Sequence, residues 1–285
     1  MTIHKKFLNV AGAILLAGTM ALNATEDKKE QDKRAETTAA VVEAGKKAQT
    51  EAAVLPIELV KKAYAYIGNL KQYSFEAKIV NEDDLDGEMM IYLTHYYKVS
   101  VIRPDKVRMD VRGDVENRNT YFDNGKVSII DIDDETYGEV QVSADIDEAL
   151  DDLTEKYGIA IPLTQLLYSD TDENMDDFKD GDYFGTVLVD GAPCYYVGFP
   201  GRDWDIQVWV EKGDKPLIRR AAFVDKKKKG QPRSMISVKW NLDGKIDENM
   251  FVFKAPNDAI KAKVFTLEEA KNLKIKYDAD SKDVK

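Results

Sequence analysis

Short segments in which apolar and polar residues alternate recur from residue 73 to residue 242, and this pattern constrains the fold most. Apolar side chains occupy every second position in residues 73–80, and the same spacing returns in residues 88–104 and 106–112. A period of two places apolar side chains on one face of a β-strand and polar side chains on the other. The pattern therefore predicts many strands that are buried on one face only.

Turn residues separate these segments at short intervals. Asn124-Gly125 lies between two apolar runs and predicts a tight hairpin, and Asp190-Gly191 gives a further turn signal. The turns divide the chain into about eleven strands, whose short connections favour antiparallel pairing. We expect an α+β fold, a single strongly curved antiparallel sheet with helices packed on its apolar face.

Helical spacing replaces the alternation in two places. Pro56 opens a segment with apolar residues at Leu59, Val60, Ala63, Tyr66, Ile67 and Leu70. Asp145 can cap a second helix over residues 146–157, which Gly158 would end. The pattern also predicts a short helix at 162–169, a short strand at 249–256 and a C-terminal helix from 267, capped by Thr266.

The N-terminal residues have the layout of a cleaved secretory signal. Lys5 and Lys6 precede an apolar run at 7–22, and Ala21 and Ala24 are candidate cleavage positions. The run is shorter than the roughly 20 residues of a spanning helix, so cleavage is favoured over a membrane anchor. The expected organisation is a signal peptide (1–24), a flexible charged tether (25–55), one folded domain (56–260) and a partly helical C-terminal tail (261–285).

Charge and cysteine usage exclude several classes of function. The formal net charge is −11, and it becomes −13 when Lys5 and Lys6 are removed with the signal. Such a chain repels nucleic-acid backbones and anionic membrane surfaces at long range, so we expect no nucleic-acid partner. Cys194 is the single cysteine, so no internal disulfide can form, and we interpret it as a small buried apolar residue.

Catalytic and metal-binding patterns are weak. His95 is the one histidine after the signal and falls in an apolar row, which is typical of a hydrogen-bonded core residue. Without a second base, neither a nucleophile triad nor a zinc site can be assembled. We therefore expect no enzyme, no cofactor and no metal.

Acidic runs keep one enzymatic alternative open. They lie at 82–86, 131–135, 147–152 and 170–177, and paired carboxylates from them would suit a hydrolase. A calcium loop starting at Asp170 fails because Met175 replaces the required glycine and Gly181 the required carboxylate. Solvated acidic surfaces are the favoured interpretation, with weak calcium binding as the remaining alternative.

Two groups of basic residues are candidates for anion binding. Lys106, Arg108 and Arg112 alternate with apolar residues, so they point away from the apolar face, where Asp110 can pair with them. Exposed pairs of this kind contribute roughly 0–1 kcal/mol. The lysine run at 226–229 is interpreted as a soluble turn that discourages edge pairing.

The apolar face carries the main functional hypothesis. Methionine and aromatic side chains suit pockets for variable apolar ligands, and a curved sheet that its helices fill only in part leaves such a pocket. An ordinary filled core is the alternative. The residues expected to line the cavity are Phe75, Met89, Ile91, Leu93, Tyr97, Val107, Met109, Val111, Ile206, Val208 and Trp240.

Five stretches together carry a family resemblance over roughly residues 56–256. They are RPDKVRMDVRGD (103–114), YFDNGKVSIID (121–131), DEALDDLTEKYGIAIPLTQLLYSD (147–170), VDGAPCYYVGF (189–199) and WDIQVWVEKGDKPLIRR (204–220). In order and spacing they resemble domain-of-unknown-function family 2092, predicted periplasmic proteins of bacteria. That family is similar to the outer-membrane lipoprotein carriers and to the sensor domain of periplasmic sigma-factor regulators.

The resemblance implies a half-open antiparallel barrel closed by helices over an apolar cavity, which holds acyl chains in the carriers. It also implies a periplasmic location. We therefore expect a carrier or envelope sensor that binds a lipid-like apolar ligand and is not integral to the membrane. A protein-interaction module of the envelope, offering its sheet edge to a partner, is the alternative.

Overall fold

The computed structural model describes residues 55–85, 88–171 and 181–280, which belong to one compact unit, Val54–Lys285. The predicted signal peptide and all but the last residue of the predicted tether lie outside the described residues. Within the described ranges, no helix is both long enough and apolar enough to cross a membrane.

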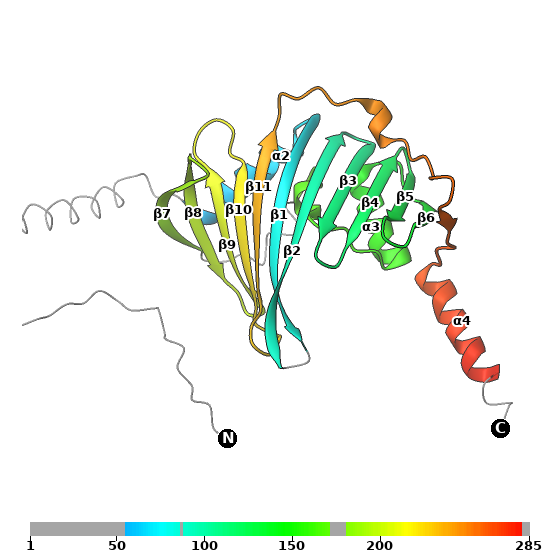
Figure 1. The fold of residues 1–285 in the computed structure, drawn as a ribbon. Coiled ribbons are helices and arrows are strands. Elements are labelled where there is room, and N and C mark those ends of the chain that lie inside the picture. Colours follow the sequence, from blue (N-terminus) through cyan, green and yellow to red (C-terminus); the bar gives the residue numbers. More distant parts are fainter. Residues whose placement is uncertain (1–54, 86–87, 172–180, 281–285) are drawn as a thin grey trace, which may run out of the picture. The chain divides into compact units, whose positions relative to one another are not determined.

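The strands form one sheet of twelve, which confirms the predicted α+β class with a single curved, unclosed antiparallel sheet (Figure 1). The described residues form twelve strands, where the sequence predicts about eleven. The strands are β1 (Gln72–Leu85), β2 (Met89–Ile102), β3 (Lys106–Gly113), β4 (Asn117–Asp123), β5 (Lys126–Asp131), β6 (Thr136–Gln141), β7 (Asp182–Val189), β8 (Ala192–Pro200), β9 (Trp204–Glu211), β10 (Ile218–Asp225), β11 (Arg233–Asn241) and β12 (Ile260–Lys261).

Two antiparallel meanders make up the sheet, and β1 joins them by pairing with β11. The strand order is β12-β6-β5-β4-β3-β2-β1-β11-β10-β9-β8-β7. Strands β1 and β11 lie far apart in the sequence but are neighbours at the centre of the sheet, with Ala77 opposite Val238. Within each meander, turns connect consecutive strands as the sequence predicts, and Asn124 and Gly125, between β4 and β5, have φ values of 46° and 83°.

Two elements near the C-terminus differ from the sequence prediction. The predicted strand at 249–256 is wrong, because Glu248–Phe251 forms the 3₁₀ turn η3, which the Asp247 carboxylate caps by accepting from the Asn249 amide. The twelfth strand is β12 instead, and it pairs in parallel with β6.

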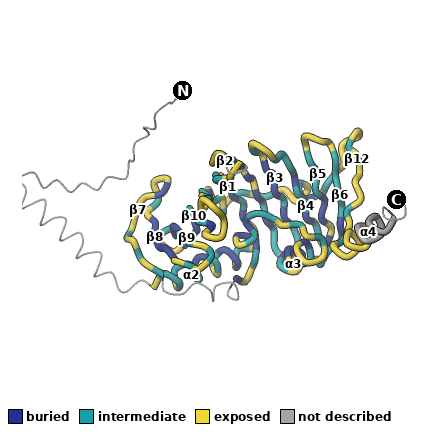
Figure 2. Tube along the Cα trace, turned by 90° about the horizontal axis from the view of Figure 1, so that it is seen from below, coloured by how far each residue is buried: buried dark blue, intermediate teal, exposed yellow. Residues whose placement is uncertain are grey.

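The helices are α2 (Pro56–Gly68), α3 (Ile146–Tyr157), the 3₁₀ turn η1 (Thr164–Leu166) and α4 (Leu267–Asp280). Both predicted caps are confirmed, since Asp145 accepts from the Asp147 amide and Thr266 from the Glu269 amide. The helix predicted at 162–169 is only the short turn η1. Helices α2 and α3 lie along the concave face of the sheet (Figure 2).

The main core lies between this concave face and the two helices. Alternate residues of the central strands are almost fully buried there, among them Tyr73, Phe75, Val99 and Val101. The ring of Phe75 packs against that of Trp240 with centroids 5.0 Å apart, so the aromatic side chains tie β1 to β11. Burial of this apolar row is the main favourable term that holds the two meanders together.

A smaller cluster lies on the other face of the sheet, built from Val189, Cys194 and Trp209. Cys194 has no exposed surface, which confirms the sequence interpretation of a small buried apolar residue. Burial raises the pKa of its thiol to about 11, so the thiolate that reacts with electrophiles is disfavoured.

Candidate functional site: an apolar cavity

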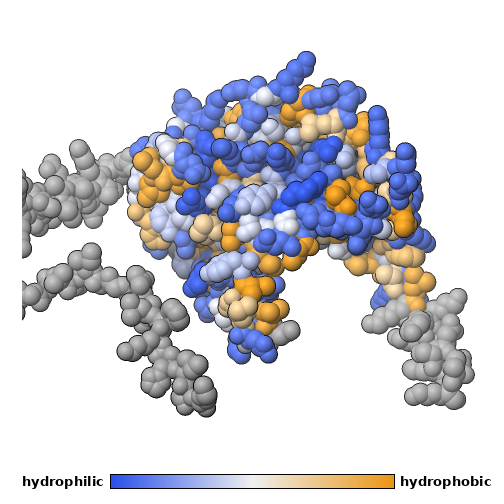
Figure 3. Space-filling view, viewed as in Figure 1, coloured by the Kyte–Doolittle hydropathy of each residue, from blue (hydrophilic) through white to orange (hydrophobic). Residues whose placement is uncertain are grey.

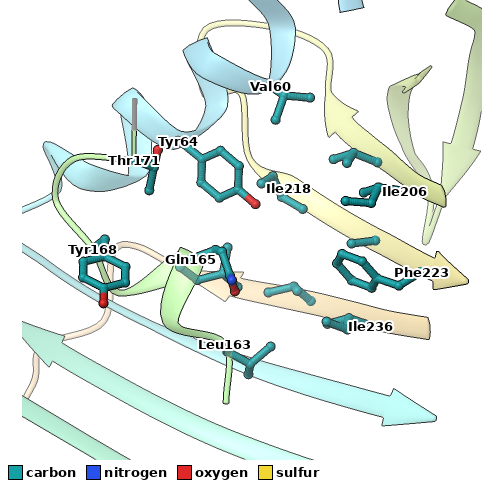
Figure 4. A pocket seen from close by; sticks show the side chains of 14 residues that line it. Val60, Tyr64, Leu163, Gln165, Tyr168, Thr171, Ile206, Ile218, Phe223 and Ile236 are labelled. Carbon is teal, nitrogen blue, oxygen red and sulfur yellow. The ribbon is translucent and has the colours of Figure 1, made fainter. Parts of the chain in front are cut away.

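A cavity of about 390 Å³ lies on the concave face, between α2, the segment 163–171 and strands β9 to β11 (Figure 4). Its volume falls within the roughly 300–1,000 Å³ that small-molecule sites occupy. The residues that line it are Val60, Tyr64, Leu163, Gln165, Leu166, Tyr168, Thr171, Ile206, Val208, Ile218, Ala221, Phe223, Ile236 and Val238.

The strand wall of the cavity is a cross-strand row. Val208 of β9 lies opposite Ala221 of β10, which lies opposite Ile236 of β11. Residues in register on neighbouring strands share a face, so all three side chains point to the concave side. Ala221 has the smallest side chain of the row, and space remains above it.

The helix wall comes from α2. Val60 and Tyr64 are one helical turn apart and therefore lie on the same side of the helix. Both line the cavity, and Figure 4 shows the Tyr64 hydroxyl directed into it, towards Ile218.

The third wall, segment 163–171, is held by a polar network around Arg103. The Arg103 Nη2 atom donates to the Tyr168 carbonyl (3.0 Å) and to the Tyr73 hydroxyl (3.3 Å). Tyr73 in turn donates to the Leu166 carbonyl at 2.6 Å. Gly68 supports the same wall, because a Cβ at this position would collide with the Ser169 carbonyl. The segment is therefore fixed to the sheet and to α2.

The polar groups of the cavity are neutral. None of the described residues that line it carries a charge. Burial raises the pKa of Tyr64 to about 12, so its phenol keeps its proton at physiological pH. Tyr168 also has its pKa raised to about 12, by burial and by the Asp151 carboxylate to which its hydroxyl donates.

Two of the residues predicted to line a cavity, Ile206 and Val208, line this one. Phe75 and Trp240 lie beside it in the packed core, where the Trp240 indole donates to the Ile218 carbonyl at 2.8 Å.

The predicted site residues on β3 lie under α3 instead. Val107 and Met109 border a gap of only about 30 Å³ against α3 residues such as Leu150. Tyr97 and Val111 border an even smaller gap of about 10 Å³ beside Ile161. This half of the concave face is filled, as in the filled-core alternative.

Met89, Ile91 and Leu93 lie on a hairpin arm, defined here as residues 82–85 and 88–94. The arm extends past the neighbouring strands, because β11 pairs with β1 only as far as Asn81 and β3 pairs with β2 only from His95 (Figures 1 and 3). Met89 is 56% exposed, and none of the three lines the large cavity.

His95 is buried as predicted, but the predicted hydrogen bond is wrong for one of its nitrogens. Its Nδ1 atom has no hydrogen-bond partner within the described ranges. The side chain lies over Gly113, where a Cβ would be only 2.5 Å from the imidazole Cδ2.

The basic row lies on the outer face of the sheet. Arg108 pairs with Asp110 at 3.0 Å, donates to the Met250 carbonyl and lies over the Tyr121 ring. Arg112 donates to the Asn119 side-chain oxygen at 2.8 Å. These contacts account for the arginines without a bound anion.

Sequence reasoning missed most of the cavity-lining residues. Tyr64 follows Val60 by one helical turn, and this spacing could have placed it on the same side of the helix. The predicted apolar face instead followed Ala63 and Ile67 and omitted Tyr64. Ile236 and Val238 alternate with Trp240 on one strand, so the same pattern that selected Trp240 also points to them. The segment 163–171 gives no such signal.

Metal-binding and acid–base chemistry receive no support at this cavity. No group of three or more histidine, cysteine or acidic side chains placed to hold a metal ion occurs in the part of the chain the structure describes. Most of the acidic run that starts at Asp170 lies outside the described residues.

Comparison with known proteins identifies a family. A family model described as "Predicted periplasmic protein (DUF2092)" matches residues 57–265. A search of curated proteins finds no match.

Several solved structures resemble the chain at low identity. An uncharacterized conserved protein from Thermus thermophilus is 12% identical, with 72% of this chain and 97% of that chain covered and a TM-score of 0.40. The lipoprotein LppX from Mycobacterium tuberculosis is 12% identical, with 67% and 97% covered and a TM-score of 0.38. A LolA superfamily protein from Nitrosomonas europaea is 10% identical, with 70% and 99% covered and a TM-score of 0.32.

Proposed function

The chain belongs to the DUF2092 family of predicted periplasmic proteins, and on this premise we propose that it is a periplasmic binding protein for a lipid-like apolar molecule. The ligand occupies the cavity between α2, segment 163–171 and β9 to β11. The protein acts as a carrier or an envelope sensor, and no enzymatic step is part of the proposal.

The observation that carries this proposal is the apolar, uncharged lining of a cavity of about 390 Å³. Each methylene group that leaves water for such a site contributes about 0.8 kcal/mol. An alkyl chain can therefore bind without any specific polar contact. Two walls of the cavity are regular elements and the third is fixed by Arg103, so the site is preformed.

A cavity-filling substitution tests the proposal. Ile236→Trp places a larger side chain in the cavity, whereas Met235→Trp changes the next residue on β11, which is 45% exposed on the outer face. Binding of the uncharged fluorophore N-phenylnaphthylamine is measured for both variants and the wild type. We expect at least about a tenfold loss of affinity for Ile236→Trp and no change for Met235→Trp.

Native mass spectrometry of the protein purified from cells without detergent is the second measurement. We expect a bound amphiphile in the wild type and its loss in Ile236→Trp. Recovery of the wild type without any bound amphiphile, together with no fluorophore binding, would contradict the proposal.

A protein-interaction role is a second candidate, favoured by the edge of the sheet at β7. Among the described residues this strand pairs only with β8, and it exposes Phe184 (55%) and Leu188 (74%). Free strand edges and exposed apolar residues are what an added strand from a partner uses. Under this alternative, Leu188→Lys abolishes capture of an envelope protein and Ile236→Trp does not.

A further inference from the structure

The uncharged lining of the cavity limits which polar groups the proposed ligand can carry. An alkyl chain in the membrane or the envelope usually carries a polar group, and that group must meet either water or the protein. Three lining residues offer neutral polar groups, namely Tyr64, Gln165 and Thr171. Gln165 is exposed, whereas Thr171 is only 8% exposed.

Tyr64 is the phenol that is free to serve a ligand. No hydrogen bond joins its hydroxyl to any other residue within the described ranges, and Figure 4 shows that hydroxyl pointing into the cavity. The second phenol of the lining, Tyr168, donates to Asp151 at 2.8 Å and is already committed. The Tyr64 Oη atom is not one of the fully buried polar atoms that lack a partner within the described ranges, so it is accessible from the cavity and available to an acceptor on a ligand.

The partly buried cations Arg103 and Arg220 do not provide a countercharge, because neither lines the cavity. Arg103 lies behind segment 163–171, where its Nη2 atom donates to Tyr73 and Tyr168 and its Nη1 atom lies 3.7 Å from Asp147. Arg220 lies over the Trp209 ring of the second cluster and does not line the cavity, and its Nε atom has no hydrogen-bond partner within the described ranges. A carboxylate in the cavity would therefore be buried without a cation, which strongly favours its protonated form.

We propose that the cavity selects uncharged lipids, in which an alcohol, ester or amide oxygen at the end of an alkyl chain accepts a hydrogen bond from Tyr64, over free fatty-acid anions. The inference rests on the proposed function and narrows its ligand class. It adds Tyr64 as the residue that determines specificity for the polar end.

Competition between two ligands of equal chain length tests the selection. Dodecanol and dodecanoate each displace N-phenylnaphthylamine from the full chain. At about pH 7.5 we expect dodecanol to displace the fluorophore at a concentration at least about tenfold lower. Towards about pH 5 the difference shrinks, because a carboxylic acid of ordinary pKa then takes up its proton, whereas displacement by dodecanol stays constant.

Tyr64→Phe removes the hydroxyl and keeps the ring, with Tyr66→Phe on the same helix as the matched control. Tyr66 does not line the cavity. We expect Tyr64→Phe to weaken dodecanol binding about fivefold more than it weakens fluorophore binding, and Tyr66→Phe to change neither.

The outcomes separate the two proposals. Equal displacement by dodecanol and dodecanoate at about pH 7.5, or equal dodecanol affinities for the Tyr64 and Tyr66 variants, overturns the selection and leaves the apolar cavity in place. Absence of fluorophore binding by the wild type overturns the proposed function and the selection together.

Discussion

The guanidinium of Arg103 and the carboxylate of Asp147 lie 3.7 Å apart, and this pair joins the end of β2 to the first turn of α3. Asp147 also accepts from the amide and the hydroxyl of Ser169, at 2.9 and 2.6 Å. The pair therefore fixes the segment that forms one wall of the cavity. The two residues support a wall of the cavity, and neither of them lines it.

Asp147→Ala should destabilise the protein by about 2–4 kcal/mol, because it leaves a largely buried guanidinium without its carboxylate and Ser169 without an acceptor. Urea unfolding measures the change. Asp151→Ala on the same helix is the control, since it removes only an exposed hydrogen bond from Tyr168. Equal losses for the two variants would show that the Arg103 network does not hold the wall.

The pH dependence of stability should include a contribution from Glu139. Hydrogen bonds from Lys126 and Lys261 lower its pKa from 4.5 to about 2. A lowered folded-state pKa stabilises the fold above the unfolded value, and this stabilisation is lost as the pH falls from about 4.5 towards 2.

Glu139→Gln should therefore be less stable than the wild type at neutral pH, by about 1 kcal/mol after allowance for solvent screening of the two lysines. The difference should vanish near the folded-state pKa of about 2. Urea unfolding at several pH values checks both points. Glu76→Gln, which removes an exposed pair with Lys98, serves as the control. A gap between wild type and Glu139→Gln that is the same at all pH values would contradict the assignment.

The strand faces were predictable from the sequence because they depend on local alternation. Val107, Met109 and Val111 face the helices, and Arg108 and Arg112 face outward, as that alternation requires. The turn at Asn124-Gly125 was predictable for the same reason, since its φ values of 46° and 83° are those that asparagine and glycine tolerate best.

The position of the cavity was not predictable, because it depends on which part of the sheet each helix covers. Met109 and Val208 each have apolar residues two positions before and after them, so the alternation does not distinguish the two positions. Only the fold shows that α3 fills the space at Met109, whereas α2 leaves space above Val208. The pairing of β1 with β11 is likewise non-local, and it brings Ile236 and Val238 into the site.

Met109→Lys should unfold the protein or cost more than about 3 kcal/mol, since Met109 is 3% exposed and a lysine there would bring a charge into the core. Arg108→Ala, at the neighbouring position, should cost about 1–2 kcal/mol through the lost contacts with Asp110, Met250 and Tyr121. It should leave fluorophore binding unchanged, because Arg108 lies on the outer face. Thermal unfolding and fluorophore titration measure the two effects, and a loss of binding in Arg108→Ala would revive the anion-site hypothesis.

The hairpin arm should tolerate polar substitution, although its residues 89–93 are all apolar. Leu85 and Met89 are 50% and 56% exposed, and neither lines the cavity. The double variant Leu85→Ser, Met89→Ser should change the free energy of unfolding by no more than about 0.5 kcal/mol and leave fluorophore affinity unaltered. Val99→Ala, at a position of β2 that is only 1% exposed, should cost about 2 kcal/mol in the same assay. Weaker fluorophore binding by the double variant would show that the arm folds over the cavity in solution and that Met89 belongs to the site after all.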